Sequence, residues 1–402
     1  MIKMTTDAFI TDCNRYVFNT YTRTPIMLVE GKGCRVSDSN GREYLDFIAG
    51  LAACPLGHGH TGLADAICEQ AKKLIHVSNL FHIEPQIELA RILVENSFAD
   101  KAFFCNSGAE ANEGAIKLAR KSFHDKGESE RFHIITMEGS FHGRTLGTLA
   151  ATGQTKYRQG FQPDVQGFSH VPFGDIKALE SAVSSDTAAI LIEPIQGEGG
   201  VRVPPSGFLR NVRSLCDSRG CLLILDEVQT GIGRTGKLFA YEHSEITPDI
   251  VTLAKGIAGG VPMGAILATD RVAESLGPGT HAATFGGNPL ASAAALAVLR
   301  VVLFNGFLSE VDRKGLHLRK RLEDLAGKHD LIRDVRGIGL MQAIDLTIPG
   351  ANLSKDLREE GVLVNCTADT VLRFLPPLIV SNEEIDEMSE RLDHVLSKAA
   401  GG

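Results

Sequence analysis

The chain has 402 residues, 43% of them hydrophobic, and a formal net charge of −8 at pH 7. A chain of this length can bury a large core and is expected to divide into domains, and its negative charge excludes a general attraction to nucleic acid. Its eight cysteines form no Cys-x-x-Cys pair, and its first residues contain no cationic start leading into an apolar run. We therefore expect a cytoplasmic protein with reduced thiols.

Residues 25–47 predict short strands with a turn at Ser39-Asn40-Gly41. His58-Gly59-His60 follows, with His76 and His82 further along, but none of these histidines has a cysteine or carboxylate partner at the spacing of metal ligands. We interpret them as turn or core histidines and predict no metal site.

A short strand, a small polar turn and a helix running to about Lys121 are predicted over residues 103–121. Ser107 and Gly108 fall where the helix N-terminus presents free N–H groups and a positive dipole, which suits a phosphate. An ordinary N-cap is the alternative for the same segment.

The loop after the apolar residues 132–135 contains Phe141-His142-Gly143-Arg144, which places a flat ring and a guanidinium beside a glycine. Phe141 could stack on a planar cofactor there. In the alternative interpretation Phe141 is a core residue and Arg144 is a surface ion-pair partner.

The middle of the chain alternates apolar runs at 188–192 and 222–225 with a helical pattern at 208–216. This alternation is typical of an α/β fold with a mostly parallel sheet that helices cover on both faces.

Two predicted strands deliver polar residues at their ends, because Asp226 follows 222–225 and Lys255 follows 250–254. Pyridoxal phosphate needs a lysine that holds its aldehyde as an imine, and a carboxylate that keeps its ring nitrogen protonated. Burial and neighbouring cations would lower the lysine pKa, so that the amine can act as nucleophile and proton carrier. The pair therefore indicates pyridoxal-phosphate chemistry.

Residues 231–236 match the Gly-x-Gly-x-x-Gly fingerprint of dinucleotide-binding proteins. A crossover helix has no room to follow, and Asp249 opens the next strand instead of closing it. A phosphate loop is excluded as well, since Leu238 stands where Ser or Thr must bind magnesium. We interpret the glycines as a loop that turns tightly near a ligand.

The C-terminal part predicts a buried helix, a set of strands and a final helix. The apolar tract 290–299 meets Arg300, which favours a buried helix and argues against a membrane span. Strands are predicted within 331–380, and Ser381 with Glu384 forms a capping box for the last helix.

Six motifs stand in one order along the chain, and together they resemble those of the class III, fold-type I pyridoxal-phosphate aminotransferases, from about Thr24 to the C-terminus. The motifs are Asn106 to Asn112, Phe141 to Thr145, Glu193 to Gly200, Asp226 to Gly231, Ala254 to Gly256 and Thr284 to Pro289. The resemblance implies a seven-stranded, mostly parallel central sheet with helices on both faces and a smaller α+β domain. The large cofactor domain would comprise residues 61–300, and the small domain would combine 1–60 with 301–402.

The resemblance also implies a role for each matched residue. Lys255 and Asp226 would be the catalytic pair, bound to the cofactor's aldehyde carbon and ring nitrogen. The cofactor phosphate would be held by Ser107, by Gly108 and by Thr284 from the partner subunit of a homodimer, with Ala109 as a further cofactor contact. Phe141 and Val228 would sandwich the ring, and Gln229 would bond the ring hydroxyl.

For the substrates, the resemblance implies two arginines. Arg144 would bind the distant carboxylate and Arg373 the carboxylate of glutamate or 2-oxoglutarate, with Glu198 pairing Arg373 when that carboxylate is absent. Leu51 stands where ornithine-specific members carry a tyrosine, and it offers no hydrogen bond to a free α-amino group.

The activity implied is transfer of the δ-amino group of N-acetyl-L-ornithine to 2-oxoglutarate, which gives N-acetyl-L-glutamate 5-semialdehyde and L-glutamate in arginine biosynthesis. Ornithine, 4-aminobutyrate and N-succinyl-diaminopimelate are alternative donors. A nucleotide-dependent oxidoreductase built on the loop at 231–236 is a remote alternative.

Overall fold

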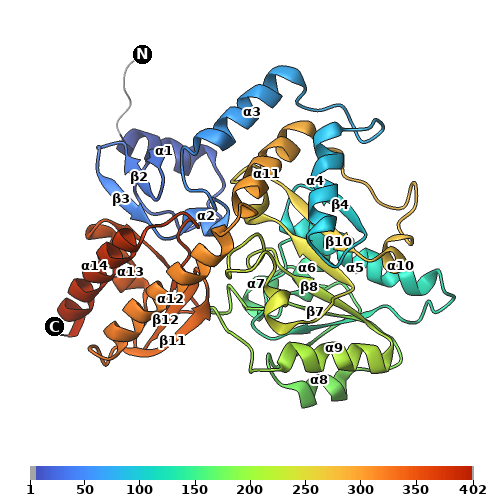
Figure 1. The fold of residues 1–402 in the computed structure, drawn as a ribbon. Helices are drawn as coiled ribbons and strands as arrows, with labels where there is room; N and C mark the ends of the chain where they lie inside the picture. Colours follow the sequence, from blue (N-terminus) through green and yellow to red (C-terminus); the bar gives the residue numbers. More distant parts are fainter. Residues whose placement is uncertain (1–5, 401–402) are drawn as a thin grey trace.

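The computed structural model describes residues 6–400 and is built around a seven-stranded sheet (Figure 1). Strand β10 is antiparallel to both of its neighbours, while the pairs among β5 to β9 are parallel. This confirms the predicted α/β fold. In spatial order the strands are β4 (Lys101–Cys105), β10 (Gly264–Ala268), β9 (Ile250–Leu253), β8 (Leu222–Asp226), β7 (Thr187–Ile192), β5 (His133–Met137) and β6 (Phe168–Val171).

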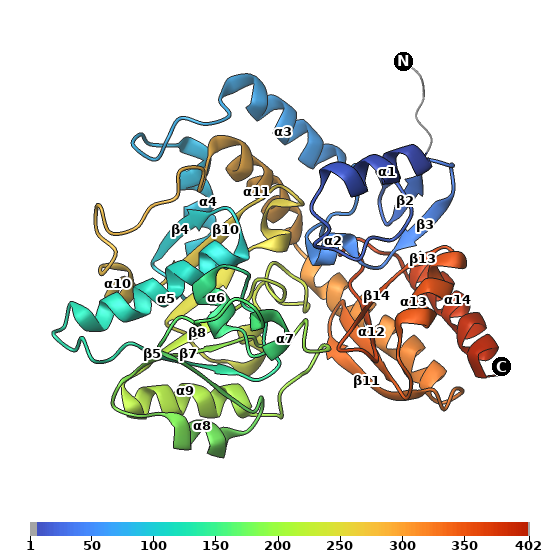
Figure 2. The ribbon, with the colours of Figure 1, turned by 180° about the vertical axis from the view of Figure 1, so that it is seen from behind.

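Side chains of the central strands alternate between two cores, one on each face of the sheet. In β8, Leu222 and Ile224 pack with α5, whereas Leu223 and Leu225 pack on the opposite face with α8 and α9. Figure 2 shows α5 and α6 on the side of the sheet away from the viewer of Figure 1. The bounds are α5 (Gly108–His124), α6 (Leu146–Ala151), α8 (Ile176–Ala182) and α9 (Phe208–Arg219).

Five strands of this sheet have their carboxyl ends beside one another. Open α/β sheets bind their ligands outside such strand ends. Each end leads directly into a residue of interest, so the sheet assembles them from distant parts of the sequence. Asn106 and Ser107 follow β4, Phe141 lies after β5, Glu193 follows β7, Asp226 ends β8 and Lys255 lies after β9.

A second region combines an N-terminal and a C-terminal segment of the chain, because β13 pairs in parallel with β3 through Val362 and Leu45. One sheet has the order β1-β2-β3-β13 and another the order β11-β12-β15-β14. The strands are β1 (Leu28–Lys32), β2 (Arg35–Asp38), β3 (Glu43–Asp46), β11 (Ile332–Ile338), β12 (Met341–Leu346), β13 (Val362–Leu363), β14 (Asn365–Thr367) and β15 (Val371–Phe374). The predicted boundaries at residues 60 and 300 stay a proposal, which the pairing of β3 with β13 supports.

The remaining helices flank these sheets. Helix α11 contacts α3 and α4, and α12 contacts β11 and α14. Their bounds are α1 (Thr6–Tyr16), α3 (Thr61–Lys73), α4 (Glu84–Glu95), α7 (Thr155–Arg158), α10 (Asp270–Ala273), α11 (Pro289–Val302), α12 (Phe307–Ala326), α13 (Ala351–Glu359) and α14 (Asn382–Ala400).

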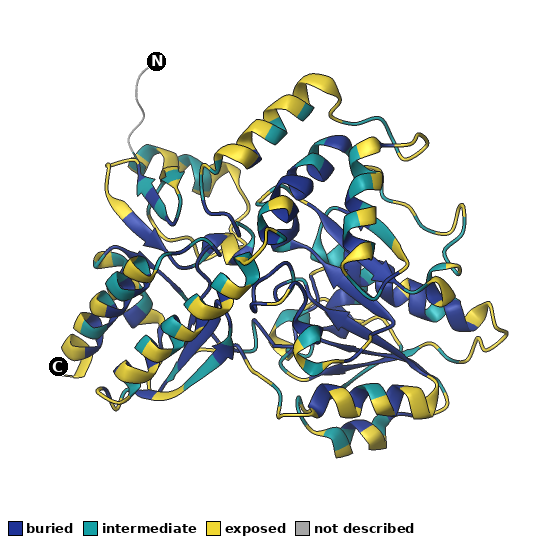
Figure 3. Ribbon diagram, viewed as in Figure 1, coloured by how far each residue is buried: buried dark blue, intermediate teal, exposed yellow. Residues whose placement is uncertain are grey.

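The apolar tract forms α11, most of whose residues are buried, as predicted (Figure 3). Within residues 6–400, no single helix has the length and apolar character needed to cross a membrane. Only α11 and α12 taken together have that length and apolar character, and the two helices are bent by 72° relative to each other.

The interpretation of the glycine loop was partly wrong. After β8 the chain forms turns and the short 3-10 helix η1 (Ala240–Ser244), so no crossover helix follows, as expected. However, a side chain on Gly233 would meet Leu308 at 3.1 Å, and one on Gly236 would meet Asp312 at 2.9 Å. These glycines therefore allow close packing against α12, and residues 231–236 do not line the cavity at the strand ends.

Three local predictions are confirmed: a turn, the end of one helix and the start of another. The carboxylate of Asp38 accepts bonds from the amides of Asn40 and Arg42, which closes the predicted turn. The helix predicted to end at about Lys121 continues to His124. At the start of α14, Ser381 and Glu384 form the reciprocal bonds of a capping box, at 3.2 and 2.9 Å.

Replacing Ser381 with alanine is expected to lower the free energy of unfolding by about 1 kcal/mol, because the amide of Glu384 loses its acceptor. Denaturant unfolding monitored by circular dichroism measures the change. Ser397→Ala, at an exposed position of the same helix, is the control and should have little effect. Equal stabilities of the two variants would contradict the assignment.

Candidate active site

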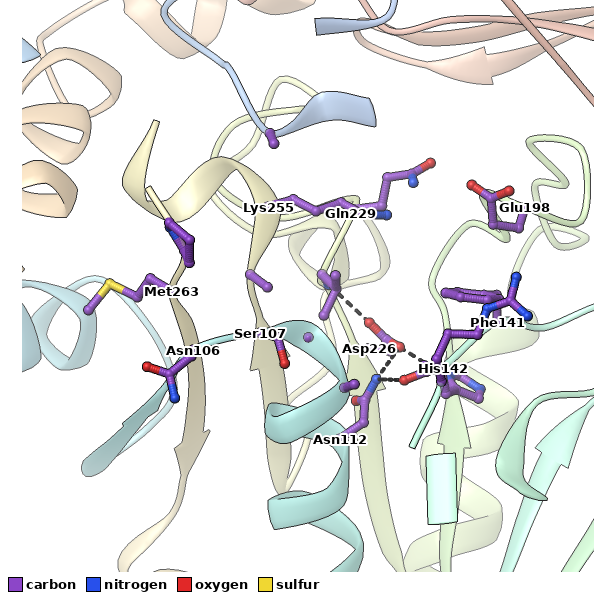
Figure 4. A pocket seen from close by; sticks show the side chains of 18 of the residues that line it. Asn106, Ser107, Asn112, Phe141, His142, Glu198, Asp226, Gln229, Lys255 and Met263 are labelled. Atoms are coloured by element: carbon purple, nitrogen blue, oxygen red, sulfur yellow. Dashed lines mark hydrogen bonds and ion pairs between the residues drawn. The ribbon is translucent and has the colours of Figure 1, made fainter. Parts of the chain in front are cut away.

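A cavity of about 320 Å³ lies where the strands of the large sheet end (Figure 4). It brings together ten of the predicted site residues: Ser107, Gly108, Ala109, Phe141, Arg144, Glu198, Asp226, Val228, Gln229 and Lys255. Arg373 reaches it through Glu198 and Gln229. Leu51, which is 42% exposed, and Thr284, which is also exposed, do not line the cavity of their own chain.

Asp226 is the buried anion at the floor of the cavity. The alternation of β8 turns its side chain to the same face as Leu222 and Ile224, towards α5. One carboxylate oxygen accepts bonds from Asn112 Nδ2 and His142 Nδ1, both at 2.8 Å, and the other accepts the Val228 amide at 3.0 Å (Figure 4). Three donors thus stabilise a charge that burial alone would disfavour.

Lys255 extends into the cavity from the start of η2 (Lys255–Ala258). Its amine makes no hydrogen bond or ion pair with any residue between 6 and 400. Burial lowers the pKa of Lys255 and the Arg373 charge lowers it further, while Glu198, Asp226 and Glu193 act in the opposite sense. A neutral amine is a better nucleophile, so this environment favours reaction with a carbonyl carbon.

The N-terminus of α5 borders the cavity at Ser107 and Gly108. The hydroxyl oxygen of Ser107 accepts the Glu110 amide at 3.1 Å, so Ser107 is the N-cap of α5, and this role is compatible with the predicted phosphate site. This bond leaves the hydroxyl proton free to be donated to an anion. A side chain on Gly108 would meet Val228 at 2.9 Å, so glycine lets the helix start lie directly against the loop after β8.

Arg373 is fully buried and pairs with Glu198 at 2.7 Å. Burial raises the pKa of Glu198, but the Arg373 charge and then that of Lys255 outweigh it, so the pKa lies below its ordinary value. Nη2 of Arg373 has no partner among residues 6–400. The guanidinium therefore has one occupied and one open position for a carboxylate.

Three polar residues that sequence reasoning did not assign belong to this site: Asn112, His142 and Glu193. Asn112 joins Asp226 to Thr252, whose hydroxyl donates to the amide oxygen at 2.7 Å. Glu193 accepts the amides of Phe141 and Gly197, and burial raises its pKa to about 7, with Asp226 adding to the effect and His142 opposing it. All three stand within the quoted motifs or beside them, but only the folded sheet shows their contacts.

The chain near the cavity mouth adopts a strained left-handed turn at α2 (Ala49–Ala52). Ala49, Leu51 and Ala52 have φ values of 47°, 61° and 68°, and each such residue costs about 1–2 kcal/mol. Asp46 stabilises the turn by accepting the amides of Ile48 and Ala49, both at 2.9 Å. Lys255, at φ 44°, is strained as well, and such strain is typical of functional sites.

Two of the four histidines for which no metal was predicted, His58 and His60, have partners within the protein. His58 Nε2 lies 2.8 Å from Asp46, and His60 accepts the Leu63 amide at the start of α3. Within the described part of the chain, no three His, Cys, Asp or Glu residues are placed to hold a metal ion.

The family model for class III aminotransferases matches residues 16–396. The chain belongs to the class III aminotransferase family. Among curated relatives, the acetylornithine aminotransferase of Caldanaerobacter subterraneus subsp. tengcongensis is 54% identical over 97% of this chain and 99% of its own length. That of Methanocaldococcus jannaschii is 51% identical over 96% of each.

Solved structures of this family share the fold. The ornithine aminotransferase of Toxoplasma gondii ME49 superposes with a TM-score of 0.95 at 35% identity, covering 99% of this chain and 96% of that one. The N-acetylornithine aminotransferase of Stenotrophomonas maltophilia K279a gives a TM-score of 0.85 at 39% identity, covering 98% and 99%. Another structure of the Toxoplasma gondii enzyme is described with partial occupancy of pyridoxal phosphate at its active site.

Class III aminotransferases depend on pyridoxal phosphate, and the residues of this cavity fit that cofactor. An unpaired amine on Lys255 suits its aldehyde, and the carboxylate of Asp226 suits a protonated ring nitrogen. The helix start at Ser107 and Gly108 suits its phosphate. These groups lie around one cavity, so the chain meets each requirement of the cofactor in one place.

Asn112→Ala is expected to weaken cofactor binding about tenfold, because Asp226 loses a hydrogen bond to a charged group, worth about 1.5 kcal/mol. Cofactor titration followed by absorbance gives the dissociation constant. Ser122→Ala is the control, since Ser122 is buried in the same helix and donates only to the Ala119 carbonyl. An unchanged constant for Asn112→Ala would show that Asp226 does not need this amide.

Proposed function

We propose that this aminotransferase moves the δ-amino group of N-acetyl-L-ornithine to 2-oxoglutarate, forming N-acetyl-L-glutamate 5-semialdehyde and L-glutamate. The observation that carries the proposal is the unpaired Lys255 amine, which extends into the cavity. Arg144 lines this cavity, and Arg373 pairs with Glu198, which also lines it. Relatives named acetylornithine aminotransferase, 48–54% identical over almost the whole chain, support the choice of donor.

In this proposal Phe141 and Val228 would hold the cofactor ring, Ser107, Gly108 and Ala109 would hold its phosphate, and Gln229 would bond its ring hydroxyl. The bound pyridoxal phosphate supplies an electron sink for the carbon that loses a proton. Asp226 keeps the ring nitrogen protonated, and Asn112 and His142 hold Asp226 in place.

Lys255 first holds the cofactor and then moves a proton between the substrate carbon and the cofactor's C4′ carbon. Its lowered pKa favours this second task, because a lower pKa leaves a larger fraction of the amine neutral and able to accept the proton. Arg144 orients the distant carboxylate of each substrate. Arg373 binds the α-carboxylate of glutamate or 2-oxoglutarate and returns to Glu198 when that carboxylate is absent, which avoids leaving a buried cation unpaired.

A homodimer is part of the proposal, with Thr284 contributed to the phosphate site of the partner subunit. An exposed apolar surface beside the Thr284 loop supports it: Leu80, Phe81 and Phe285 are 87%, 68% and 58% exposed. Asn79 ties the two loops together through bonds to the carbonyls of Ala283 and Gly286. A second copy that covers this surface would remove a large apolar area from water.

A cytoplasmic location also belongs to the proposal. All eight cysteines are free, and Cys34, Cys105, Cys216 and Cys221 are buried, which suits a compartment that keeps thiols reduced.

Lys255→Ala is expected to lose nearly all turnover and to bind the cofactor only noncovalently. Borohydride reduction followed by peptide mass spectrometry should fix the cofactor to Lys255 in the wild-type chain and to no peptide in the variant. A cofactor adduct on another lysine would refute the role.

Arg373→Ala is expected to slow the half-reaction with glutamate at least tenfold more than the half-reaction with N-acetylornithine. In the first, Arg373 meets the α-carboxylate, whereas in the second it pairs only with Glu198. Single-turnover absorbance changes with each substrate measure the two rates. Equal losses would contradict the exchange of partners at Arg373.

The choice between N-acetylornithine and ornithine depends on the α-amino group. The three carboxylates that line the cavity are all engaged: Glu198 by Arg373, Asp226 by Asn112 and His142, and Glu193 by two amides. Leu51 offers no hydrogen bond either. A charged α-ammonium would lack a partner, whereas an acetylated nitrogen is neutral.

We therefore expect kcat/KM for N-acetyl-L-ornithine to exceed that for L-ornithine by at least about tenfold, a difference of about 1.4 kcal/mol in transition-state binding. A panel that adds 4-aminobutyrate and N-succinyl-diaminopimelate, assayed with 2-oxoglutarate, tests the proposal. Parity, or a preference for ornithine or 4-aminobutyrate, would replace the proposed donor with the alternative.

A further inference from the structure

Arg144 is the exposed cation at the cavity mouth, and an aromatic ring holds it. Its guanidinium carbon lies 4.1 Å from the ring centroid of Tyr157 and 5.3 Å from that of Phe141. The two rings meet edge to face, with centroids 5.6 Å apart and planes at 83°. Among residues 6–400, no carboxylate forms an ion pair with Arg144, which excludes the surface ion-pair alternative for the described chain.

Tyr157 has a fixed place because its short helix α7 is tied to the loop that precedes Phe141. Gln154 Nε2 donates to the carbonyls of Gly139 and Ser140, at 3.1 and 3.2 Å, and the Tyr157 amide donates to the Gln154 carbonyl. The ring therefore has a defined position relative to Phe141, and hence to the cavity.

The backbone on the C-terminal side of Arg144 is fixed separately. Glu113 of α5 accepts the amides of Gly147 and Thr148 at 3.0 and 3.1 Å, which anchors the start of α6. This anchor does not reach the Arg144 side chain, so among residues 6–400 the rings of Tyr157 and Phe141 are the contacts that restrict its guanidinium. A ring face holds a cation without occupying its N–H donors, so all of them stay open to a carboxylate.

We propose that Tyr157 is a positioning residue that aims Arg144 at the distant carboxylate of the substrates and so contributes to their selection. The inference rests on the proposed role of Arg144. Lys156 Nζ lies 4.8 Å from the centroid of the same ring, and this lysine stays unchanged in the test.

The test compares two amine donors that differ only in the carboxylate, N-acetyl-L-ornithine and N-acetylputrescine. Tyr157→Leu is expected to reduce kcat/KM for N-acetyl-L-ornithine about fivefold, mainly through KM, and to leave the value for N-acetylputrescine within about twofold. Tyr157→Phe keeps the ring face and is expected to restore the wild-type ratio. Phe161→Leu, at a 61% exposed ring nearby that stacks on no cation of the described chain, is the control and should keep the ratio.

A binding measurement separates positioning from chemistry. Calorimetry with N-acetyl-L-norvaline, which has the carboxylate but no reactive amine, should show about fivefold weaker binding to Tyr157→Leu, with the cofactor absorbance unchanged. The inference fails if Tyr157→Leu keeps the wild-type ratio of donors, if Tyr157→Phe is as impaired as Tyr157→Leu, or if both donors lose equally.

Arg144→Ala distinguishes this failure from that of the proposed function. If Arg144→Ala removes the preference for the carboxylated donor and Tyr157→Leu does not, only the role of Tyr157 is wrong. If Arg144→Ala itself leaves the ratio unchanged, the proposed carboxylate site at Arg144 is wrong and the inference falls with it.

Discussion

The buried carboxylate of Asp226 is the constraint on which the rest of the site depends. Only 3% of this residue is exposed, and its charge is tolerable because Asn112, His142 and the Val228 amide donate to it. Those donors come from α5, from the loop after β5 and from the turn after β8. The order of the strands, the packing of α5 on the sheet and the position of the Phe141 loop must therefore all be correct before the charge is stabilised.

Four of the ten non-glycine residues with a positive φ among residues 6–400 lie in two turns that touch each other. The left-handed turn Ala49–Ala52 lies against the 3-10 turn that begins at Lys255, and a side chain on Gly256 would come 3.4 Å from the Ala52 carbonyl. Neither turn would persist as an isolated peptide, because each residue with a positive φ opposes it. The bonds from Asp46 stabilise the first turn, and contacts between α2 and η2 join it to the second, so the segment around residue 50 helps to shape the site at the large sheet.

Two arginines at the cavity are held by different physical means, and the difference suits different tasks. Arg373 is fully buried, so an unpaired charge there would be expensive and Glu198 accompanies it. Arg144 is exposed at the mouth and needs no counter-ion, so the faces of Tyr157 and Phe141 suffice. In the proposed function, Arg373 exchanges Glu198 for a substrate carboxylate, whereas the stacked Arg144 presents all its donors to each substrate in turn.

The sequence by itself determined the α/β fold, the strands that end at Asp226 and before Lys255, and the capping box at Ser381, because these follow from local periodicity and from side chains a few residues apart. It could not reveal that Asn112 and His142 meet at one carboxylate, that the glycines at 233 and 236 pack against α12, or that Tyr157 lies under Arg144. Those contacts join segments far apart in the chain. Only the tertiary structure decided them, because the order of the strands and the packing of helices and loops around them set the distances between such segments.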